Sequence, residues 1–156
     1  MKFKLLGLVS VSLLAAAAVY SQSNPPTIRG SIAGGTVTRG QVARATVVLS
    51  IPGGLHVNSN RPNSEYQIPT TVRVSAKGVR VGPVSYPRGK NRKFSFSEST
   101  INIYDGRVSF GFNVTVPANY KGERLSLRVT VKYQACTDEV CYPPKSKAVT
   151  LTARVQ

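Results

Sequence analysis

The chain has 156 residues, with 21 Lys or Arg against 6 Asp or Glu, and a formal net charge of +15. This length fits one domain that can bury a core without the help of disulfides. A single His and the absence of paired acidic residues outside one loop argue against a metal centre or a hydrolase. The positive charge favours anionic partners, but no nucleic-acid-binding motif occurs, so we expect no nucleic acid to bind.

The first 21 residues have the pattern of a secretory signal peptide, because Lys2 and Lys4 precede an apolar run that ends in small residues. We expect cleavage after Ser21 or after Ala18. The sequence therefore predicts export, to the periplasm or beyond it. The protein would contact the membrane only if the signal peptide stays uncleaved. Residues 22–35, rich in Pro, Gly and Ser, are predicted to form a flexible leader into a domain over 36–156.

β-Strand signals fill the rest of the chain. Alternating segments rich in Val and Thr occur over 41–51, 67–76, 79–86, 99–104, 107–116, 124–133 and 147–155. Gly-containing turn signals separate most of them, and none has the spacing of an amphipathic helix. About seven to nine short strands predict an all-β fold, an immunoglobulin-like antiparallel β-sandwich. Within 124–133, the side chains predicted to face the core are Leu125, Leu127, Val129 and Val131.

The two cysteines, Cys136 and Cys141, stand in the segment YQACTDEVCYPPK between the last two predicted strands. In an exported protein such a pair is expected to be oxidised. A ring of about six residues would stabilise the fold by only roughly 2 kcal/mol. The spacing alone leaves two interpretations open, a structural disulfide and a couple that exchanges with other thiols. The residues expected to flank the sulfurs are Tyr133, Asp138, Tyr142 and Pro143.

The only histidine, His56, follows a Gly-Gly turn in GLHVNSN. We interpret it as a strand residue with a packing or hydrogen-bonding role. Neither a metal nor a cofactor is expected.

Three segments resemble the N-terminal periplasmic domain of DsbD, the bacterial thiol:disulfide interchange family. YQACTDEVCYPPKSKAV is similar to that family's cysteine segment. GLHVNSNRPNSEYQIPTTV and YPRGKNRKFSFSESTINIYDG are similar to two further stretches of it, in the same order. The resemblance spans about residues 45–150, nearly the whole mature domain.

This resemblance implies an immunoglobulin-like sandwich whose cysteine pair cycles between dithiol and disulfide. Cys141 would attack a partner's disulfide, and Cys136 would resolve the mixed intermediate. The family's cap would correspond to the segment from Lys93 to Tyr104, with Phe96, or else Phe94, as the aromatic shield. The ring has four residues between its cysteines, whereas the best-known member of the family has five.

The implied partners are a thioredoxin-like or membrane electron donor and exported disulfide-containing proteins. The family's transmembrane and thioredoxin-like domains do not occur in this sequence, so we expect a stand-alone copy that another protein reduces. The predicted function is an exported thiol–disulfide interchange module, a component of protein-disulfide reduction. The alternative is a non-enzymatic envelope protein with a purely structural disulfide and a basic anion-binding surface. The basic side chains can also be interpreted as solvated residues on strand faces and loops that bind no partner.

Overall fold

The computed structural model describes residues 24–156, in which all the regular elements except one short turn are β-strands. The predicted signal peptide over 1–21 lies outside the described residues. The only helical element described is a single 3-10 turn, η1 (Ala33–Gly35). Within residues 24–156, no helix has the length and apolar character needed to cross a membrane.

Two four-stranded sheets form the body of the molecule. The first sheet has the order β1 (Thr27–Ile32), β3 (Val42–Ser50), β9 (Arg107–Thr115) and β6 (Arg80–Val81). The second has the order β2 (Thr36–Val37), β12 (Lys145–Val155), β10 (Arg124–Tyr133) and β5 (Thr71–Ala76). Neighbouring strands are antiparallel, except that β2 runs parallel to β12.

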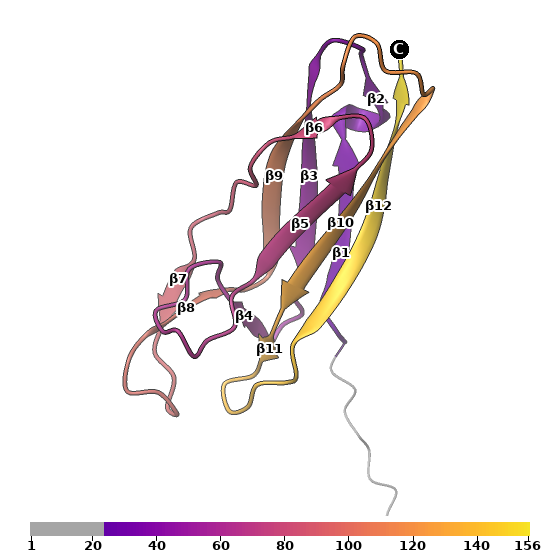
Figure 1. The fold of residues 1–156 in the computed structure, drawn as a ribbon. Coiled ribbons are helices and arrows are strands. Elements are labelled where there is room, and N and C mark those ends of the chain that lie inside the picture. Colours follow the sequence, from indigo (N-terminus) through magenta and orange to yellow (C-terminus); the bar gives the residue numbers. More distant parts are fainter. Residues whose placement is uncertain (1–23) are drawn as a thin grey trace, which may run out of the picture.

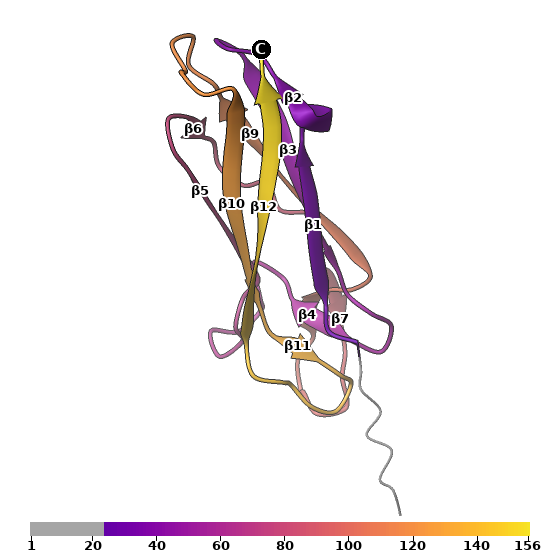
Figure 2. The ribbon, with the colours of Figure 1, turned by 90° about the vertical axis from the view of Figure 1, so that its right-hand side faces the viewer.

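The two sheets face each other along the length of the molecule (Figures 1 and 2) and enclose one apolar core. Alternation along the strands decides which side chains enter it, because successive residues of a strand point to opposite faces. Leu125, Leu127, Val129 and Val131 of β10 are all fully buried, whereas Ser126 and Arg128 between them are exposed. The prediction of an all-β, immunoglobulin-like antiparallel sandwich is confirmed.

A third, smaller sheet lies at one end of the sandwich, at the bottom of Figure 1. Its order is β11 (Ala135–Cys136), β4 (His56–Asn58), β8 (Ile101–Tyr104) and β7 (Lys90–Arg92). Three irregular segments adjoin it: the loop over 59–70, the cap over 93–100 between β7 and β8, and the loop over 137–144 after β11. We call this sheet and these segments the cysteine end.

The structure differs from the prediction of a flexible leader over 22–35. Residues 27–32 form β1, which pairs with β3 along its whole length, and η1 follows. Gly30 makes this possible, because a Cβ there would lie 2.5 Å from the Thr46 carbonyl oxygen and 3.0 Å from Leu151. The predicted strand over 79–86 is reduced to β6 and an isolated bridge at Ser85, since Gly82-Pro83 interrupts it.

Candidate thiol–disulfide site

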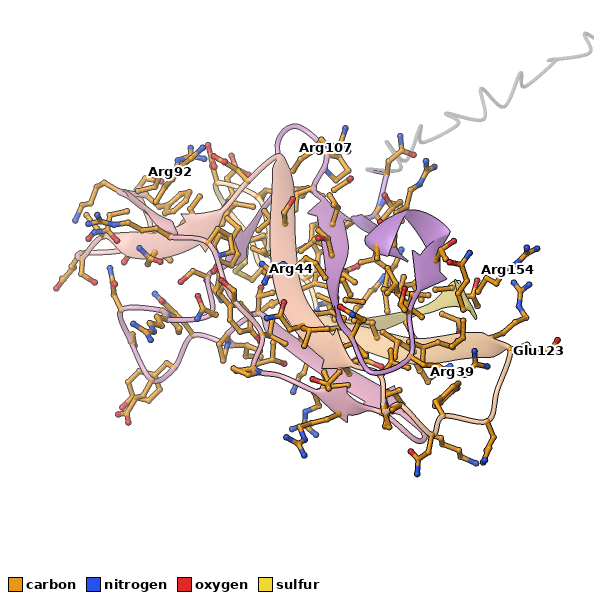
Figure 3. The ribbon with its side chains drawn as sticks, turned by 90° about the horizontal axis from the view of Figure 1, so that it is seen from above. Arg39, Arg44, Arg92, Arg107, Glu123 and Arg154 are labelled. Carbon is orange, nitrogen blue, oxygen red and sulfur yellow. A yellow bond between two sulfur atoms is a disulfide. The ribbon has the colours of Figure 1, made fainter. Side chains whose placement is uncertain are left out.

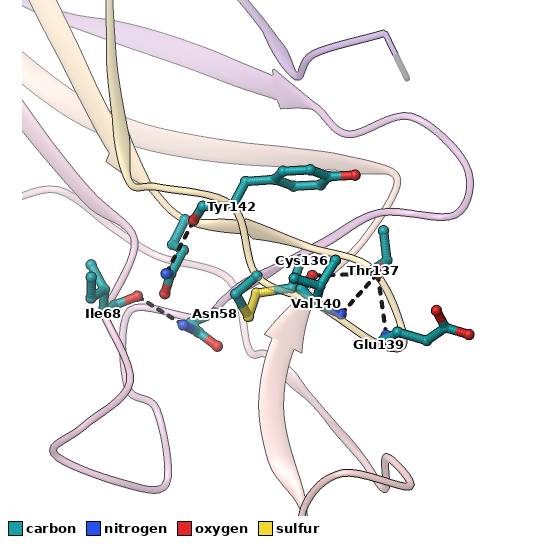
Figure 4. Close-up of a disulfide and its surroundings, with 9 residues drawn as sticks. Asn58, Ile68, Cys136, Thr137, Glu139, Val140 and Tyr142 are labelled. Atoms are coloured by element: carbon teal, nitrogen blue, oxygen red, sulfur yellow. Dashed lines mark hydrogen bonds between the residues drawn. A yellow bond between two sulfur atoms is a disulfide. The ribbon is translucent and has the colours of Figure 1, made fainter. Parts of the chain in front are cut away.

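Cys136 and Cys141 form a disulfide across a short hairpin (Figure 4). Their Cα atoms lie 4.0 Å apart, and the two residues face each other in an antiparallel bridge. The backbone N–H of Tyr142 donates to the carbonyl of Ala135 at 2.8 Å, and that of Thr137 donates to the carbonyl of Val140 at 2.8 Å. Since these bonds flank the cysteine pair, the pair is of the non-hydrogen-bonded type, in which side chains lie closest.

The turn of this hairpin is held by the side chain of Thr137. Its hydroxyl oxygen accepts hydrogen bonds from the backbone N–H groups of Val140 at 3.0 Å and Glu139 at 3.2 Å. Such local bonds replace the pairing that a longer hairpin would supply. The hairpin therefore has a defined shape although it projects from the end of the sandwich.

The two cysteines differ in their access to solvent. Cys136 is 1% exposed, because β11 pairs with β4 beneath it. Cys141 is exposed to solvent, as are the residues from Asp138 to Val140 before it. Cys141 is therefore the cysteine of the pair that faces solvent.

Aromatic rings from the cap cover the neighbouring part of the sheet. His56 pairs with Cys136 in the β4–β11 ladder, and its ring stacks on Phe94 with a centroid distance of 4.4 Å. Phe96 stacks on the outer side of Phe94 at 5.3 Å. Phe94 is 4% exposed and Phe96 is 49% exposed, so Phe94 is the inner ring and Phe96 the outer one. The interpretation of His56 as a packed strand residue is confirmed.

One ion pair joins the cap to the hairpin. The Arg92 guanidinium, at the start of the cap, lies 3.6 Å from a carboxylate oxygen of Asp138. It also lies 5.0 Å from the centroid of the Phe94 ring, within cation–π range. The sequence did not predict this ion pair, because no regular spacing connects two opposite charges that lie so far apart in the chain.

Asp138 lies apart from the other predicted flanking residues, Tyr133, Tyr142 and Pro143, which line a small cavity. Its volume is about 220 Å³, and its apolar lining includes Leu55, Tyr133, Ala135, Tyr142 and Pro143. The Tyr133 hydroxyl is buried and has no hydrogen-bond partner among the described residues. Burial raises the pKa of Tyr133. The cavity has room for one side chain of a partner protein.

Tyr104, predicted to belong to the cap, lies elsewhere. Alternation in β8 sends Ile101 and Ile103 to the cluster beneath the cap with Phe94, and sends Tyr104 to the main core. Its hydroxyl donates to the Pro87 carbonyl at 2.9 Å, and its ring meets Phe110 edge-on. Tyr104 therefore supports the sheet and does not shield the sulfurs.

Burial and nearby charges both act on the pKa of the His56 imidazole. Burial lowers the pKa of His56 first, and the positive charge of Arg92 lowers it further, while Asp138 and Asp105 act in the opposite direction. No group of three or more His, Cys, Asp or Glu side chains gathers as a metal site within residues 24–156.

A β-sandwich that presents one accessible sulfur of a hairpin disulfide defines a class of thiol–disulfide proteins, and comparison with known proteins identifies the family. The family described as "Thiol:disulfide interchange protein DsbD, N-terminal" matches residues 33–153. This chain belongs to that family.

A curated relative, the thiol:disulfide interchange protein DsbD of Actinobacillus pleuropneumoniae serotype 5b (strain L20), is 23% identical over 97 residues. That stretch is 62% of this chain but 15% of the relative.

Two solved structures are similar to this chain. The N-terminal periplasmic domain of ScsB from Proteus mirabilis matches with a TM-score of 0.54 at 11% identity, over 85% of this chain and 48% of that one. The N-terminal domain of Neisseria meningitidis DsbD in the reduced form matches with a TM-score of 0.47 at 19% identity, over 78% of this chain and 86% of that one.

Proposed function

We propose that this protein is an exported thiol–disulfide interchange module that passes reducing equivalents between protein partners through Cys136 and Cys141. The family supports interchange chemistry, and the signal-peptide pattern supports export to the periplasm. The electron donor would be a thioredoxin-like or membrane protein, and the acceptors would be exported proteins that contain disulfides. Sulfur exchange of this kind requires no bound cofactor.

The observation that carries the proposal is the unequal exposure of the two cysteines, Cys136 being buried and Cys141 exposed. In the reduced protein, the thiolate of Cys141 attacks one sulfur of a partner's disulfide, and the partner's other sulfur leaves as a thiolate. Cys136 then attacks the sulfur of Cys141, which re-forms the Cys136–Cys141 disulfide and releases the partner's second thiol. The partner gains two electrons and the module loses two, which the donor's dithiol restores.

The surroundings of Cys141 suit this sequence of steps. A partner joined to Cys141 must lay the chain around its own cysteine over Tyr142 and Pro143, next to the apolar cavity. A large apolar side chain of the partner would fill that cavity and hold the mixed disulfide in place. On the other side, Phe94 and Phe96 of the cap would shield the sulfurs, with Phe96 as the ring that moves because it is half exposed.

The test compares two cysteine variants in cell-envelope extracts. Cys136→Ser leaves Cys141 free to attack but removes the resolving thiol, so it should accumulate mixed disulfides with envelope proteins. Cys141→Ser is the matched control and should trap none, because Cys136 is buried. Equal trapping by both variants, or trapping by neither, would contradict the proposal.

A second candidate function rests on the outward face of the sheet formed by β5, β10 and β12. Five exposed cations project from it, and none takes part in the ion pairs found within residues 24–156: Arg73, Arg124, Arg128, Lys132 and Arg154. Arg124 and Arg154 stand directly opposite each other, an arrangement of like charges that disfavours pairing unless an anion lies between them. Anionic lipid headgroups or an acidic polymer would satisfy this face.

Co-sedimentation with phosphatidylglycerol vesicles tests this face, with phosphatidylcholine vesicles as the neutral probe. The variant Arg73→Ser/Arg124→Ser/Arg128→Ser should lose most of its binding. The control Arg29→Ser/Arg44→Ser/Arg107→Ser removes the same charge from the opposite sheet and should keep it. If both variants bind equally, net charge alone is responsible and no anion-binding face exists.

A further inference from the structure

Three residues of the site form a row across neighbouring strands. Cys136 on β11 pairs with Cys141 across the hairpin and with His56 on β4. Directly opposed residues of antiparallel strands project from the same face, with Cβ atoms about 4.5–5.5 Å apart. His56 therefore lies beside Cys136, on the side away from Cys141.

The cap fixes this imidazole and keeps water from it. His56 is 2% exposed, and Phe94, itself 4% exposed, stacks on the ring with an interplanar angle of 23°. A histidine used only for packing could be replaced here by any planar ring. An imidazole in this position adds one property, a nitrogen that can accept a proton.

The charged groups that face His56 come from three elements. Arg92 belongs to β7, Asp138 to the hairpin, and Asp105 follows β8; these residues line one hollow together with His56. Asp138 is paired with Arg92, and Asp105 lies 2.7 Å from the ammonium group of Lys90. Both carboxylates are thus already paired with cations, and burial favours the neutral imidazole, the form that can act as a base at about pH 7.

We propose that His56 accepts the proton of the Cys136 thiol when Cys136 resolves the mixed disulfide, a catalytic role that rests on the proposed exchange function. Cys136 is 1% exposed, so its thiol cannot readily lose a proton to bulk water. Burial of a thiol in apolar surroundings also opposes its ionisation. His56 is the only histidine of the chain and lies beside that thiol.

The step balances without any further reactant. The proton of Cys136 moves to a ring nitrogen of His56, and the resulting thiolate attacks the sulfur of Cys141. The bond between Cys136 and Cys141 forms as the bond between Cys141 and the partner's sulfur breaks. The partner's sulfur leaves with the electron pair and takes up a proton from water, and the imidazolium gives its proton back to water, which returns His56 to its neutral form.

Single-turnover reaction of the reduced, full-length mature domain with the aromatic disulfide DTNB separates the two steps. Attack by Cys141 releases the first thionitrobenzoate, and resolution by Cys136 releases the second. His56→Phe keeps a ring to stack on Phe94 but removes the base. We expect it to slow the second release about tenfold or more at about pH 7 and to leave the first nearly unchanged. Full ionisation of a thiol with pKa of about 8.5 is worth about 30-fold at that pH.

Ile103→Val is the matched control, since it disturbs the packing beneath the cap but keeps both the base and the Phe94 ring. It should change the second release by less than about threefold, well below the effect of removing a general base. An equal slowing by both variants would reduce His56 to a packing residue. An unchanged second release in His56→Phe would overturn the proposal and leave the exchange function intact, whereas a wild-type protein that releases no thionitrobenzoate would overturn both.

The pH profile of the wild-type protein gives an independent readout if the variant does not fold. With His56 as base, the rate of the second release should form a plateau from about pH 6.5 to about pH 8.5. Below that range it should fall as the imidazole takes up its own proton. A rate that falls tenfold per pH unit throughout this range would show unassisted thiol ionisation and contradict the proposal.

Discussion

The buried side chains of the sandwich body are apolar, whereas all four buried polar residues within 24–156, His56, Asn58, Ser59 and Thr70, belong to the cysteine end. The body is stabilised by the inward-facing aliphatic and aromatic side chains of its two long sheets, which pack against each other. The cysteine end is held by individual hydrogen bonds, such as the one from the Thr70 hydroxyl to the Asn58 carbonyl at 2.6 Å. A region held by few specific contacts opens at lower free energy than a packed core, which suits a site that must admit a partner.

The acidic residues are also unevenly distributed between the sandwich body and the cysteine end. Five of the six acidic residues lie at the cysteine end, in its loops and hairpin: Glu65, Glu98, Asp105, Asp138 and Glu139. Glu123 lies near the opposite end, by Arg154, far from Arg92 (Figure 3). The outward faces of the body carry exposed arginines with almost no acidic neighbour. The proposed anionic surface would therefore meet the body, and the proposed protein partners would meet the cysteine end, where both signs of charge mix.

The largest effect on stability should come from the core of the body. Leu127→Ala removes a fully buried side chain that lies opposite Leu151 in the ladder, and should lower the free energy of unfolding by about 2–5 kcal/mol. Urea denaturation measures this change. Ser126→Ala, on the outward face of the same strand, is the control and should change it by less than about 0.5 kcal/mol. A small effect of Leu127→Ala would show that the body is not the stable unit.

A smaller effect is expected at the cysteine end. Thr70→Val removes the hydroxyl that satisfies the Asn58 carbonyl and should cost about 1–3 kcal/mol. It should also speed reduction of the disulfide by dithiothreitol, since the cysteine end then opens more often. Thr150→Val, on the exposed face of β12, is the matched control. Faster reduction in Leu127→Ala than in Thr70→Val would contradict the division between the two regions.

The pH dependence of stability should trace to His56. Its pKa is lowered in the folded protein, so below the unfolded value of about 6.5 the unfolded state binds the proton more readily. Stability should therefore fall as pH drops from about 7 to about 5, and this loss should be much smaller in His56→Phe. Urea midpoints at the two pH values measure it. An equal loss in both proteins would place its cause in other groups.

The smallest effect should come from the ion pair between cap and hairpin. Both side chains are largely exposed, and such pairs contribute about 0–1 kcal/mol. Arg92→Gln and Asp138→Asn should each change the urea midpoint only slightly, and the double variant should match the larger single effect. A loss of several kcal/mol would show that this pair, and not the aromatic stack, holds the cap.

The alternation of apolar and polar residues predicted the strands of the sandwich body, because each long strand, such as β10 or β12, has one buried face. It failed for β1, whose sequence TIRGSI has only two apolar residues and buries little as an edge strand. The resemblance in the cysteine segment located Cys136 and Cys141, which now form the described disulfide. Their unequal exposure depends on pairing with β4, about 80 residues earlier in the chain, and no local pattern encodes it.

The arrangement around the sulfurs could be predicted only in part. The family resemblance implied a cap with Phe96, or else Phe94, as its shield, but the order of the two rings, with Phe94 inside and Phe96 outside, follows from the stack on His56. The prediction that Tyr104 belongs to the cap was wrong, because the surroundings of a strand residue depend on which side of its sheet meets the core. Flanking residues such as Tyr142 and Pro143 were predictable from the chain alone, since they adjoin Cys141.

The reduction potential of the Cys136–Cys141 disulfide, measured by equilibration with a thioredoxin-like dithiol, tests the central claim most directly. A couple that exchanges with protein partners should have a potential above about −300 mV and should be reduced by that donor. A potential well below about −300 mV, with no reduction by the donor, would identify a structural disulfide and contradict the account.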